Sequence, residues 1–186
     1  TKTVQGIMLD VVIALCPAAI AGTVLFGFRS ALIILVSVAS AVASEALYQK
    51  AVKRQVSIND FSAVITGLLL ALTLPPHVPL WIPAIGAAFA IVLVKQVFGG
   101  LGNNFLNPAL AARAFLLAAW PLHMTQDWVN PMTYDAATSA TPLAGFNATG
   151  QTAFTLKQML LGQRPGSIGE TCILALLLGG LYLIVR

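Results

Sequence analysis

The chain alternates between long apolar runs and short breaks that are rich in glycine, proline, asparagine or charge. The runs at 7–28 and 30–48 are each long enough for a helix that crosses the hydrocarbon core of a bilayer, which takes about 20 residues. Further apolar runs follow, and the segments predicted to be helices are 7–28, 30–48, 60–74, 80–97, 108–120 and 168–185. The pattern therefore predicts an all-α, polytopic integral membrane protein in which residues 1–186 form a single transmembrane domain.

Two of the predicted helices, 60–74 and 108–120, are too short to cross a bilayer. The second follows the irregular stretch "FGGLGNNFLNP", in which Asn107 is a good N-cap and Pro108 suits the first helical position. Short, broken helices of membrane proteins often direct their positive N-terminal ends at a ligand near the middle of the bilayer. A loop that ends at the membrane surface before a merely short helix explains the same pattern, and both alternatives stay open.

Composition agrees with a membrane protein and argues against nucleic-acid binding. The chain is 58% hydrophobic and 9% charged, with a mean hydropathy of +0.88, whereas soluble domains carry about 25% charged residues. The formal net charge is +4, but the basic cluster of Lys50, Lys53 and Arg54 flanks an apolar segment and forms no phosphate-binding face. We therefore expect the lipid bilayer, and no nucleic acid, as a partner.

The basic residues also predict an orientation. If the 49–56 loop is cytoplasmic, more basic residues fall inside than outside, as the positive-inside rule requires. The remaining residues that fall inside are Lys2, Lys95 and Arg186, and those that fall outside are Arg29, Lys157 and Arg164. The long polar stretch 121–166 is thus predicted to be extracytoplasmic.

The residues offer little support for a metal site or a hydrolytic centre. Cys16 and Cys172 lie in apolar runs without a Cys/His cluster, so we expect no metal. The hydroxyl-rich stretch "DAATSATPLA", 135–144, lacks a base, because the nearest histidine, His123, has no acid at helical spacing to orient it. No catalytic residue is predicted, and the threonine hydroxyls serve either as turn contacts or as a point of attachment.

The stretch "TSATPLA" resembles the flavin-attachment motif of a family of membrane subunits. The family contains the D subunit of the Rnf ferredoxin:NAD oxidoreductase complex and the B subunit of the sodium-translocating NADH:quinone reductase. The motif threonine, which carries FMN through a phosphoester bond, matches Thr141, with Thr138 and Ser139 before it. Ser139 stands where the quinone-reductase relatives usually have glycine, so the resemblance is closer to the Rnf D subunit. "DFSAVITGLLLALTLPPHVPLW", "FGGLGNNFLNPALAARAFL" and "GSIGETC" resemble further family motifs in the same order, which extends the resemblance over essentially the whole chain.

The resemblance implies a multi-pass protein of the bacterial cytoplasmic membrane, with a urea-transporter-like half-repeat, and it implies that the chain is the N-terminal half of a longer subunit. It also implies covalent FMN on Thr141, added by a separate flavin transferase. Asp135 then either organises the loop or caps a turn. A second, non-covalent flavin (riboflavin) would contact Asn104 and Asn107. Their alternative roles are hydrogen bonding to backbone groups by Asn104 and helix capping by Asn107.

The function implied by the resemblance is electron transport coupled to cation transport, in a complex with other membrane and peripheral subunits. The chain would be one subunit of a redox-driven ion translocase, with no complete active site of its own. The alternatives are the B subunit of the quinone reductase, a non-redox channel or carrier for small solutes, and a passive membrane scaffold. The threonine motif separates them, because a channel has no need of "TSATPL" in an exposed loop.

Two further charged residues lie in or beside predicted helices. Arg113 is either functional or pairs with a partner subunit or with one of the acids Asp10, Glu45 and Asp60. Glu170 is expected to have a structural role at the start of the last helix, where a carboxylate suits the helix dipole.

Overall fold

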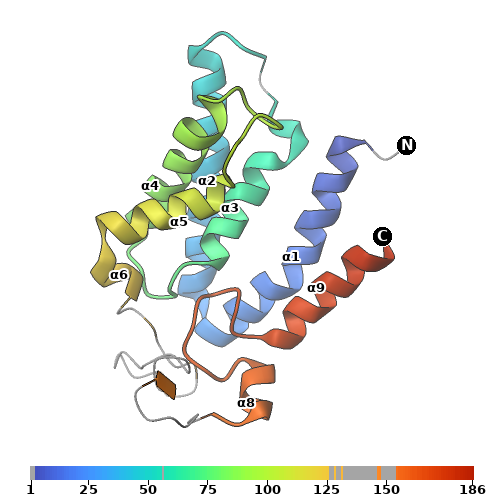
Figure 1. Cartoon of the computed structure of the whole chain (residues 1–186), viewed down its shortest axis with the longest axis vertical. Coiled ribbons are helices and arrows are strands. Elements are labelled where there is room, and N and C mark those ends of the chain that lie inside the picture. Colours follow the sequence, from blue (N-terminus) through green and yellow to red (C-terminus); the bar gives the residue numbers. More distant parts are fainter. Residues whose placement is uncertain (1–2, 56, 126–127, 129–130, 132–145, 148–153) are drawn as a thin grey trace.

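The computed structural model describes the chain except for residues 1–2, 56, 126–127, 129–130, 132–145 and 148–153. Within the described residues every regular element is helical, which confirms the all-α prediction (Figure 1). The elements are α1 (Val4–Phe26), α2 (Phe28–Ala51), η1 (Ile58–Asp60), α3 (Ser62–Leu72), α4 (Trp81–Phe89), η2 (Ala90–Gln96), α5 (Pro108–Ala119), α6 (Pro121–Thr125), α8 (Leu156–Leu161) and α9 (Ile173–Val185). Among the described residues, α1 and α2 are long and apolar enough to cross a membrane. Membrane crossing by the shorter helices stays a prediction.

Only Gly27 separates α1 from α2. Its φ of +78° lies in the left-handed region that glycine adopts without strain. The boundary predicted between the runs 7–28 and 30–48, at position 29, is wrong, because Arg29 lies within α2 and its Nη2 donates to the backbone oxygen of His77 at 3.1 Å. The backbone freedom of a glycine, and not a charge, ends α1.

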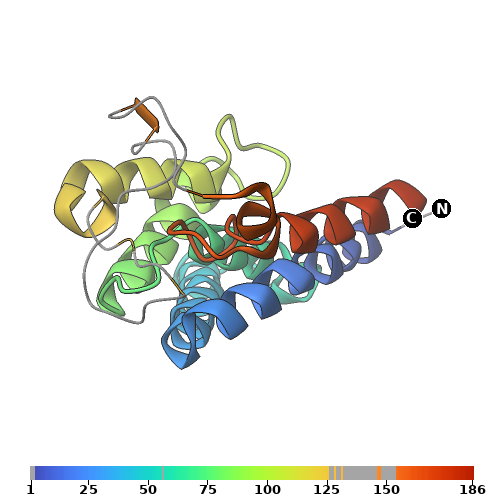
Figure 2. The ribbon, with the colours of Figure 1, turned by 90° about the horizontal axis from the view of Figure 1, so that it is seen from below.

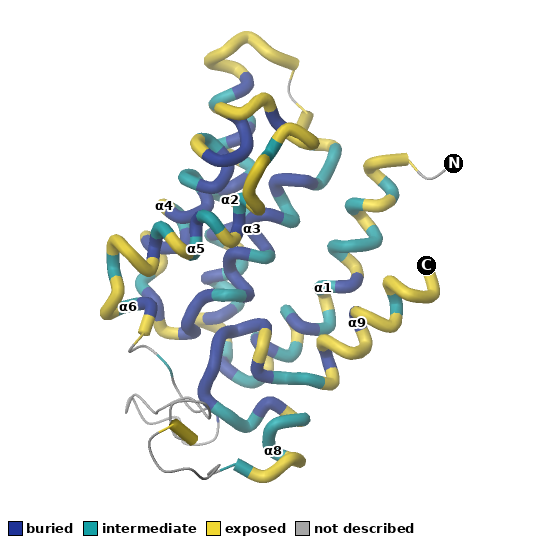
Figure 3. Tube along the Cα trace, viewed as in Figure 1, coloured by how far each residue is buried: buried dark blue, intermediate teal, exposed yellow. Residues whose placement is uncertain are grey.

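The core lies where α2 packs against α3 and α4 (Figure 1). Gly67 of α3 approaches α2 so closely that a Cβ at this position would lie 2.8 Å from the Cα of Val38. The Ser37 hydroxyl donates to the backbone oxygen of Gly67 at 2.7 Å across the same contact. Small residues and interhelical hydrogen bonds are the features that hold helices together in membranes. Figure 3 shows the contrast between this buried region and the exposed surface of α9.

The first and last helices, α1 and α9, pack side by side at the edge of the molecule (Figures 1 and 2). They approach closely at Gly179, where a Cβ would lie 2.1 Å from the backbone oxygen of Ala14. A side chain of any size at this position would push the two helices apart.

The helix that starts with α4 changes its winding before it ends. It continues into η2, a π-helical segment, and the backbone N–H of Gly100 then donates to the oxygen of Lys95, five residues back, at 3.0 Å. Gly99, Gly100 and Gly102 follow with φ values of +110°, +94° and +91°. The chain therefore leaves the helix through backbone conformations that favour glycine.

α5 starts as the sequence predicts. The Oδ1 atom of Asn107 accepts hydrogen bonds from the backbone N–H groups of Ala109 and Leu110 at 3.0 and 3.3 Å, and Pro108 occupies the start of the helix. The rings of Phe115 in α5 and Phe89 in α4 stack with centroids 4.1 Å apart. These contacts fix α5 across the face of α4.

The backbone carbonyl groups at the carboxyl end of α3 accept hydrogen bonds from distant parts of the chain. The backbone oxygens of Leu72 and Leu74 accept from the N–H groups of Gly169 and Ile168 at 2.8 and 3.1 Å. Arg113 donates to the oxygen of Thr73 through Nη1. A short helix that ends inside a membrane protein needs such partners, because lipid supplies none.

These contacts correct two expectations from the sequence. Arg113 bonds a backbone oxygen, and none of its described contacts is an ion pair with Asp10, Glu45 or Asp60. The last helix begins at Ile173 and not at 168, since residues up to Cys172 pack against the end of α3 in non-helical form. Glu170 belongs to this segment, where its Oε1 accepts from the backbone N–H of Ser167 at 3.2 Å.

Candidate functional site

Glu45 of α2 and Lys95 of η2 form a buried ion pair. Lys95 Nζ lies 2.6 Å from Glu45 Oε1, and the two side chains are 2% and 1% exposed. Taking two charges out of water costs several kcal/mol per ion unless they are well paired and hydrogen-bonded. Ionisable groups inside a membrane protein are rare for this reason, and they are candidates for a functional site.

The two oxygens of the Glu45 carboxylate have unequal surroundings. Oε1 accepts from Lys95 Nζ and Gln96 Nε2 at 2.6 Å each, and from Gln49 Nε2 at 3.4 Å. Oε2 is buried and has no hydrogen-bond partner among the described residues. Buried polar atoms almost always have partners, so Oε2 is an exception that needs a physical explanation.

The winding of η2 explains how consecutive residues reach the same oxygen. Successive side chains of an α-helix point about 100° apart, because a turn holds 3.6 residues. The wider turn of a π-helix brings neighbouring side chains closer in direction. Lys95 and Gln96 both belong to η2, and both donate to Glu45.

Further hydrogen bonds join this pair to the start of α3 and to the segment that precedes it. Lys95 Nζ donates to Ser62 Oγ, and Ser62 Oγ donates to Asp60 Oδ1, each at 2.6 Å. The Gln49 amide makes two hydrogen bonds to Ser57. Its Nε2 donates to the Ser57 hydroxyl at 2.8 Å, and its Oε1 accepts from the Ser57 backbone N–H at 2.9 Å. We call the connected residues the Glu45 cluster: Glu45, Gln49, Ser57, Asp60, Ser62, Lys95 and Gln96.

The Glu45 cluster lies between two cavities. The Glu45 cavity has a volume of about 170 Å³, and the residues that line it include Glu45, Gln49, Asp60, Gln96, Gly99 and Gly100. The Asn cavity has a volume of about 140 Å³ and is lined by Lys95, Ser62, Thr66, Asn104 and Asn107 together with apolar side chains. The cluster thus separates a polar space from a largely apolar one.

The structure brings Asn104 and Asn107 together at the Asn cavity, as the predicted flavin contact requires. Both side chains also have backbone partners. Asn107 caps α5, and the Asn104 amide, oriented to suit its neighbours, donates to the backbone oxygens of Gly100 and Lys95 at 3.2 Å each. The alternative roles, helix capping by Asn107 and hydrogen bonding to backbone oxygens by Asn104, are therefore observed, whereas the flavin contact stays a prediction.

The other predicted site residues, Thr141, Ser139, Thr138 and Asp135, lie outside the described residues. The described helices on either side of them, α6 and α8, are at the opposite end of the molecule from the turn after α2 (Figure 1). Trp81 and Trp120, whose rings lie 5.0 Å apart, are likewise at the opposite end of the α4–η2 helix from Lys95.

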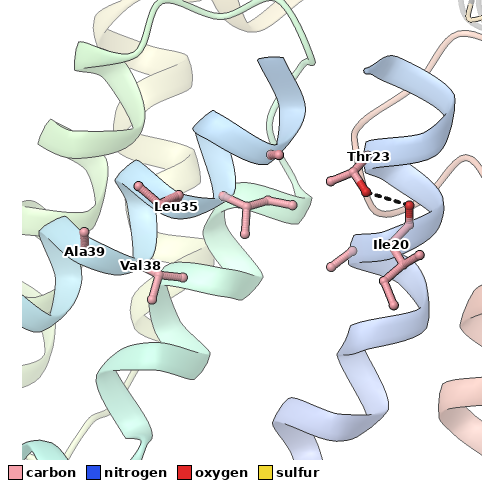
Figure 4. A pocket seen from close by; sticks show the side chains of 8 residues that line it. Ile20, Thr23, Leu35, Val38 and Ala39 are labelled. Carbon is pink, nitrogen blue, oxygen red and sulfur yellow. Dashed lines mark hydrogen bonds between the residues drawn. The ribbon is translucent and has the colours of Figure 1, made fainter. Parts of the chain in front are cut away.

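A larger cavity of about 520 Å³ lies between α1 and α2 and has no polar chemistry to offer (Figure 4). It is lined mainly by alanine, leucine, isoleucine and valine side chains. Its hydroxyl, on Thr23, donates to the backbone oxygen of Ile20 within the same helix at 2.8 Å. Such a surface suits lipid chains or a neighbouring helix and not a polar ligand.

Sequence reasoning missed the Glu45 cluster. In the orientation predicted from the basic residues, Lys95 counts as a charge at the membrane surface, whereas its ammonium group is buried against Glu45. A signal was available: Glu45 interrupts an apolar run, and Lys95 interrupts another. The tertiary pairing between them has no pattern in a single sequence.

Comparison with known proteins extends over the whole chain. The model of the NQR2, RnfD, RnfE family matches residues 1–186. The chain is 53% identical to the D subunit of the Na(+)-translocating ferredoxin:NAD(+) oxidoreductase complex of Acetobacterium woodii, an alignment that covers 97% of this chain and 58% of that protein. It is 40% identical to the D subunit of the proton-translocating ferredoxin:NAD(+) oxidoreductase complex of Clostridium ljungdahlii, with 100% and 59% covered.

A similarity over a smaller share of the chain is to the B subunit of the Na(+)-translocating NADH-quinone reductase of Neisseria meningitidis serogroup A, at 41% identity over 75% of this chain and 35% of that protein. The chain spans about three fifths of the length of the two ferredoxin:NAD(+) oxidoreductase relatives.

Proposed function

We propose that this chain, which belongs to the NQR2, RnfD, RnfE family, carries a covalent flavin in an ion-translocating ferredoxin:NAD oxidoreductase complex. The observation that carries the proposal is the 53% identity to an Rnf-type D subunit over 97% of the chain. The stretch "TSATPLA" supports the flavin, since it contains a threonine hydroxyl where the family motif attaches FMN. The chain would be one redox component of the complex and would act with other membrane and peripheral subunits.

In this proposal Thr141 is an anchor and not a catalytic nucleophile. A phosphoester from its Oγ1 to FMN, made by a separate flavin transferase, keeps the flavin at the membrane surface, where the isoalloxazine can exchange electrons with neighbouring subunits. Thr138, Ser139 and Asp135 would shape the attachment loop. The opposite positions of α6 and α8 on one side and the basic turn after α2 on the other support an extracytoplasmic location for this loop.

The Asn cavity does not fit a whole flavin as it stands. Ligand pockets usually measure about 300–1,000 Å³, whereas this cavity holds about 140 Å³. The amides of Asn104 and Asn107 suit the polar edge of an isoalloxazine, but further walls would have to come from outside this chain.

Coupling of electron transfer to cation transport is part of the proposal, and the coupling ion is left open. The two similar ferredoxin:NAD(+) oxidoreductase relatives carry names that specify different ions, Na(+) and protons. A role as the B subunit of a quinone reductase is the second candidate, because the Neisseria meningitidis protein is 41% identical.

The proposal is tested on the full-length subunit in its native membrane. Denaturing electrophoresis under ultraviolet light should show a fluorescent band at the mass of the subunit, and the peptide containing Thr141 should carry the added mass of FMN. A non-fluorescent band with an unmodified peptide, from cells that contain the flavin transferase, would overturn the covalent-flavin assignment. Reduction of NAD by ferredoxin, or of quinone by NADH, separates the two candidate complexes.

A further inference from the structure

We propose that an anionic phospholipid binds along the Gly27 end of α1, with its acyl chains in two apolar grooves and its phosphate group beside Lys157 and Arg164. The first groove is the cavity of about 520 Å³ between α1 and α2 (Figure 4). The second, which we call the α9 groove, has a volume of about 500 Å³ and is lined by apolar side chains of α1, α8 and α9 together with Cys172. Both volumes lie within the range of about 300–1,000 Å³ that is usual for ligand pockets.

A close contact bounds the α9 groove at each end. Near the middle of α1, a Cβ on Gly179 would lie 2.1 Å from the backbone oxygen of Ala14. At the other end, a Cβ on Gly162 would lie 2.7 Å from Cδ1 of Leu25. The stretch of α1 that lines the groove, from Pro17 to Leu25, is about 12 Å long at a rise of 1.5 Å per residue. One leaflet of the hydrocarbon core is about 15 Å thick, so the groove matches the depth of one leaflet and suits one acyl chain.

The two grooves are adjacent, because Ile20 lines both of them. The Ile20 side chain is 62% exposed and forms a ridge between the grooves. A phospholipid carries two acyl chains on one headgroup, so a single molecule that straddles Ile20 fills both grooves. Contact with the groove walls adds van der Waals attraction that a lipid on a flat helix surface lacks.

An exposed lysine lies close to the Gly162 end of the α9 groove. Lys157 stands four residues before Leu161 on α8, so the two side chains share a face of this helix. Leu161 lines the groove, and Lys157 is exposed. The ion pairs among the described residues involve other side chains, so the ammonium group of Lys157 is available to an anion.

Arg164 adds a second cation at this end of the groove. Its Nη2 and Nε donate to the backbone oxygens of Glu170 and Thr171 at 2.9 and 3.5 Å. These bonds hold it beside Cys172, which lines the groove. The neighbouring acid, Glu170, directs its Oε1 at the backbone N–H of Ser167 at 3.2 Å. Two positive groups therefore face one negative group, and basic residues in excess at a membrane surface attract anionic lipids.

The combination of apolar grooves and a basic mouth selects the occupant. An apolar helix of a neighbouring subunit would fill a groove but would bring no anion to Lys157 and Arg164. A free anion would meet the two basic groups but would leave the grooves without a partner. A phospholipid with a net negative headgroup, such as phosphatidylglycerol, satisfies both features.

The inference is independent of the proposed flavin, and its test needs neither flavin nor electron transfer. The purified complex that contains the full-length subunit is reconstituted in phosphatidylcholine nanodiscs. A small fraction of the lipid is phosphatidylglycerol with a photoreactive diazirine in one acyl chain, and a phosphatidylcholine with the same chain is the matched neutral probe. Peptide mass spectrometry after illumination maps the cross-links. The anionic probe should label residues 17–25 and 172–178 about fivefold more strongly than the neutral probe, the factor expected from one excess basic group.

Two variants separate the headgroup contact from the groove. Lys157→Met should lower the labelling by the anionic probe about fivefold, with little change for the neutral probe. The matched control is Lys53→Met, which removes an exposed lysine from the turn after α2 and should change neither probe. Ala21→Phe places a ring in the α9 groove and should reduce the labelling of 172–178 by both probes.

The wild-type comparison is decisive by itself if Ala21→Phe does not assemble. Equal labelling of 17–25 and 172–178 by the two probes would overturn the anionic lipid site and leave ordinary contact with the bilayer. Labelling confined to other apolar segments would also overturn it, because the rest of the subunit or a neighbouring subunit would then cover the grooves. A preference that is unchanged in Lys157→Met would contradict the assigned position of the phosphate group.

Discussion

Lys95 Nζ is held between Glu45 Oε1 and Ser62 Oγ, 2.6 Å from each, so one ammonium group joins η2 to both α2 and α3. Loss of one member of the ion pair leaves a buried, uncompensated charge. We expect Lys95→Met to reduce the stability of the folded chain by about 3–5 kcal/mol. The double variant Glu45→Gln/Lys95→Met should be less destabilised than the sum of the two single variants. The loss of stability of each variant is measured as the shift of the thermal midpoint of the purified complex, with the exposed Lys53→Met as control. A shift in the double variant equal to the sum of the two single shifts would contradict the pairing.

The contact between α2 and α3 depends on the absence of a side chain at Gly67. We expect Gly67→Ala to reduce assembly, because its Cβ would meet the backbone of α2 at 2.8 Å and the helices would have to separate, at a cost of about 1–3 kcal/mol. Gly180→Ala is the matched control, since no atom lies within 4 Å of a Cβ there. The yield of assembled complex after detergent extraction should fall for the first variant and not for the second.

Arg113 closes the carboxyl end of α3 by donating to the oxygen of Thr73. Arg113→Met should cost about 1–3 kcal/mol, because a part-buried carbonyl loses a charged donor. Hydrogen exchange at residues 70–78 should accelerate, whereas Lys157→Met, at an exposed position, should have no effect there. Unchanged exchange at 70–78 in Arg113→Met would show that this hydrogen bond is not needed.

The covalent flavin is predicted to depend on a single hydroxyl. Thr141→Ala should abolish the fluorescent band of the denatured protein, and it should cost little stability because the sequence predicts a polar extracytoplasmic stretch at this position. Thr138→Ala and Ser139→Ala should keep a flavin, with attachment reduced at most. A band that survives in Thr141→Ala would move the attachment to another residue, which peptide mass spectrometry would identify.

The orientation is tested by labelling single cysteines in a background where Cys16 and Cys172 are replaced by alanine. A membrane-impermeant maleimide added from outside the cell should label a cysteine at Asn147 and not one at Lys53. The basic turn after α2 is cytoplasmic in this prediction, and the reverse labelling pattern would invert the topology.

Hydropathy and capping rules predicted the helices well where local physics decides. Asn107 and Pro108 predict the start of α5, and the apolar runs predict α1 and α2 to within a few residues. The errors occur where tertiary contacts decide. The partner of Arg113 is a backbone oxygen from another helix, and the π-helical winding that directs Lys95 at Glu45 has no signature in the sequence.

The hydrogen bonds from Ile168 and Gly169 to the end of α3 have a consequence for biogenesis. The chain leaves the ribosome from its N-terminus, so α3 enters the translocon long before its partners have been synthesised. Until residue 169 emerges, the oxygens of Leu72 and Leu74 must be satisfied by water or by translocon groups. The short helix α3 should therefore settle at its final depth only after α9 begins to insert, and ribosome-stalled chains that end before Gly169 should retain α3 in a water-accessible position.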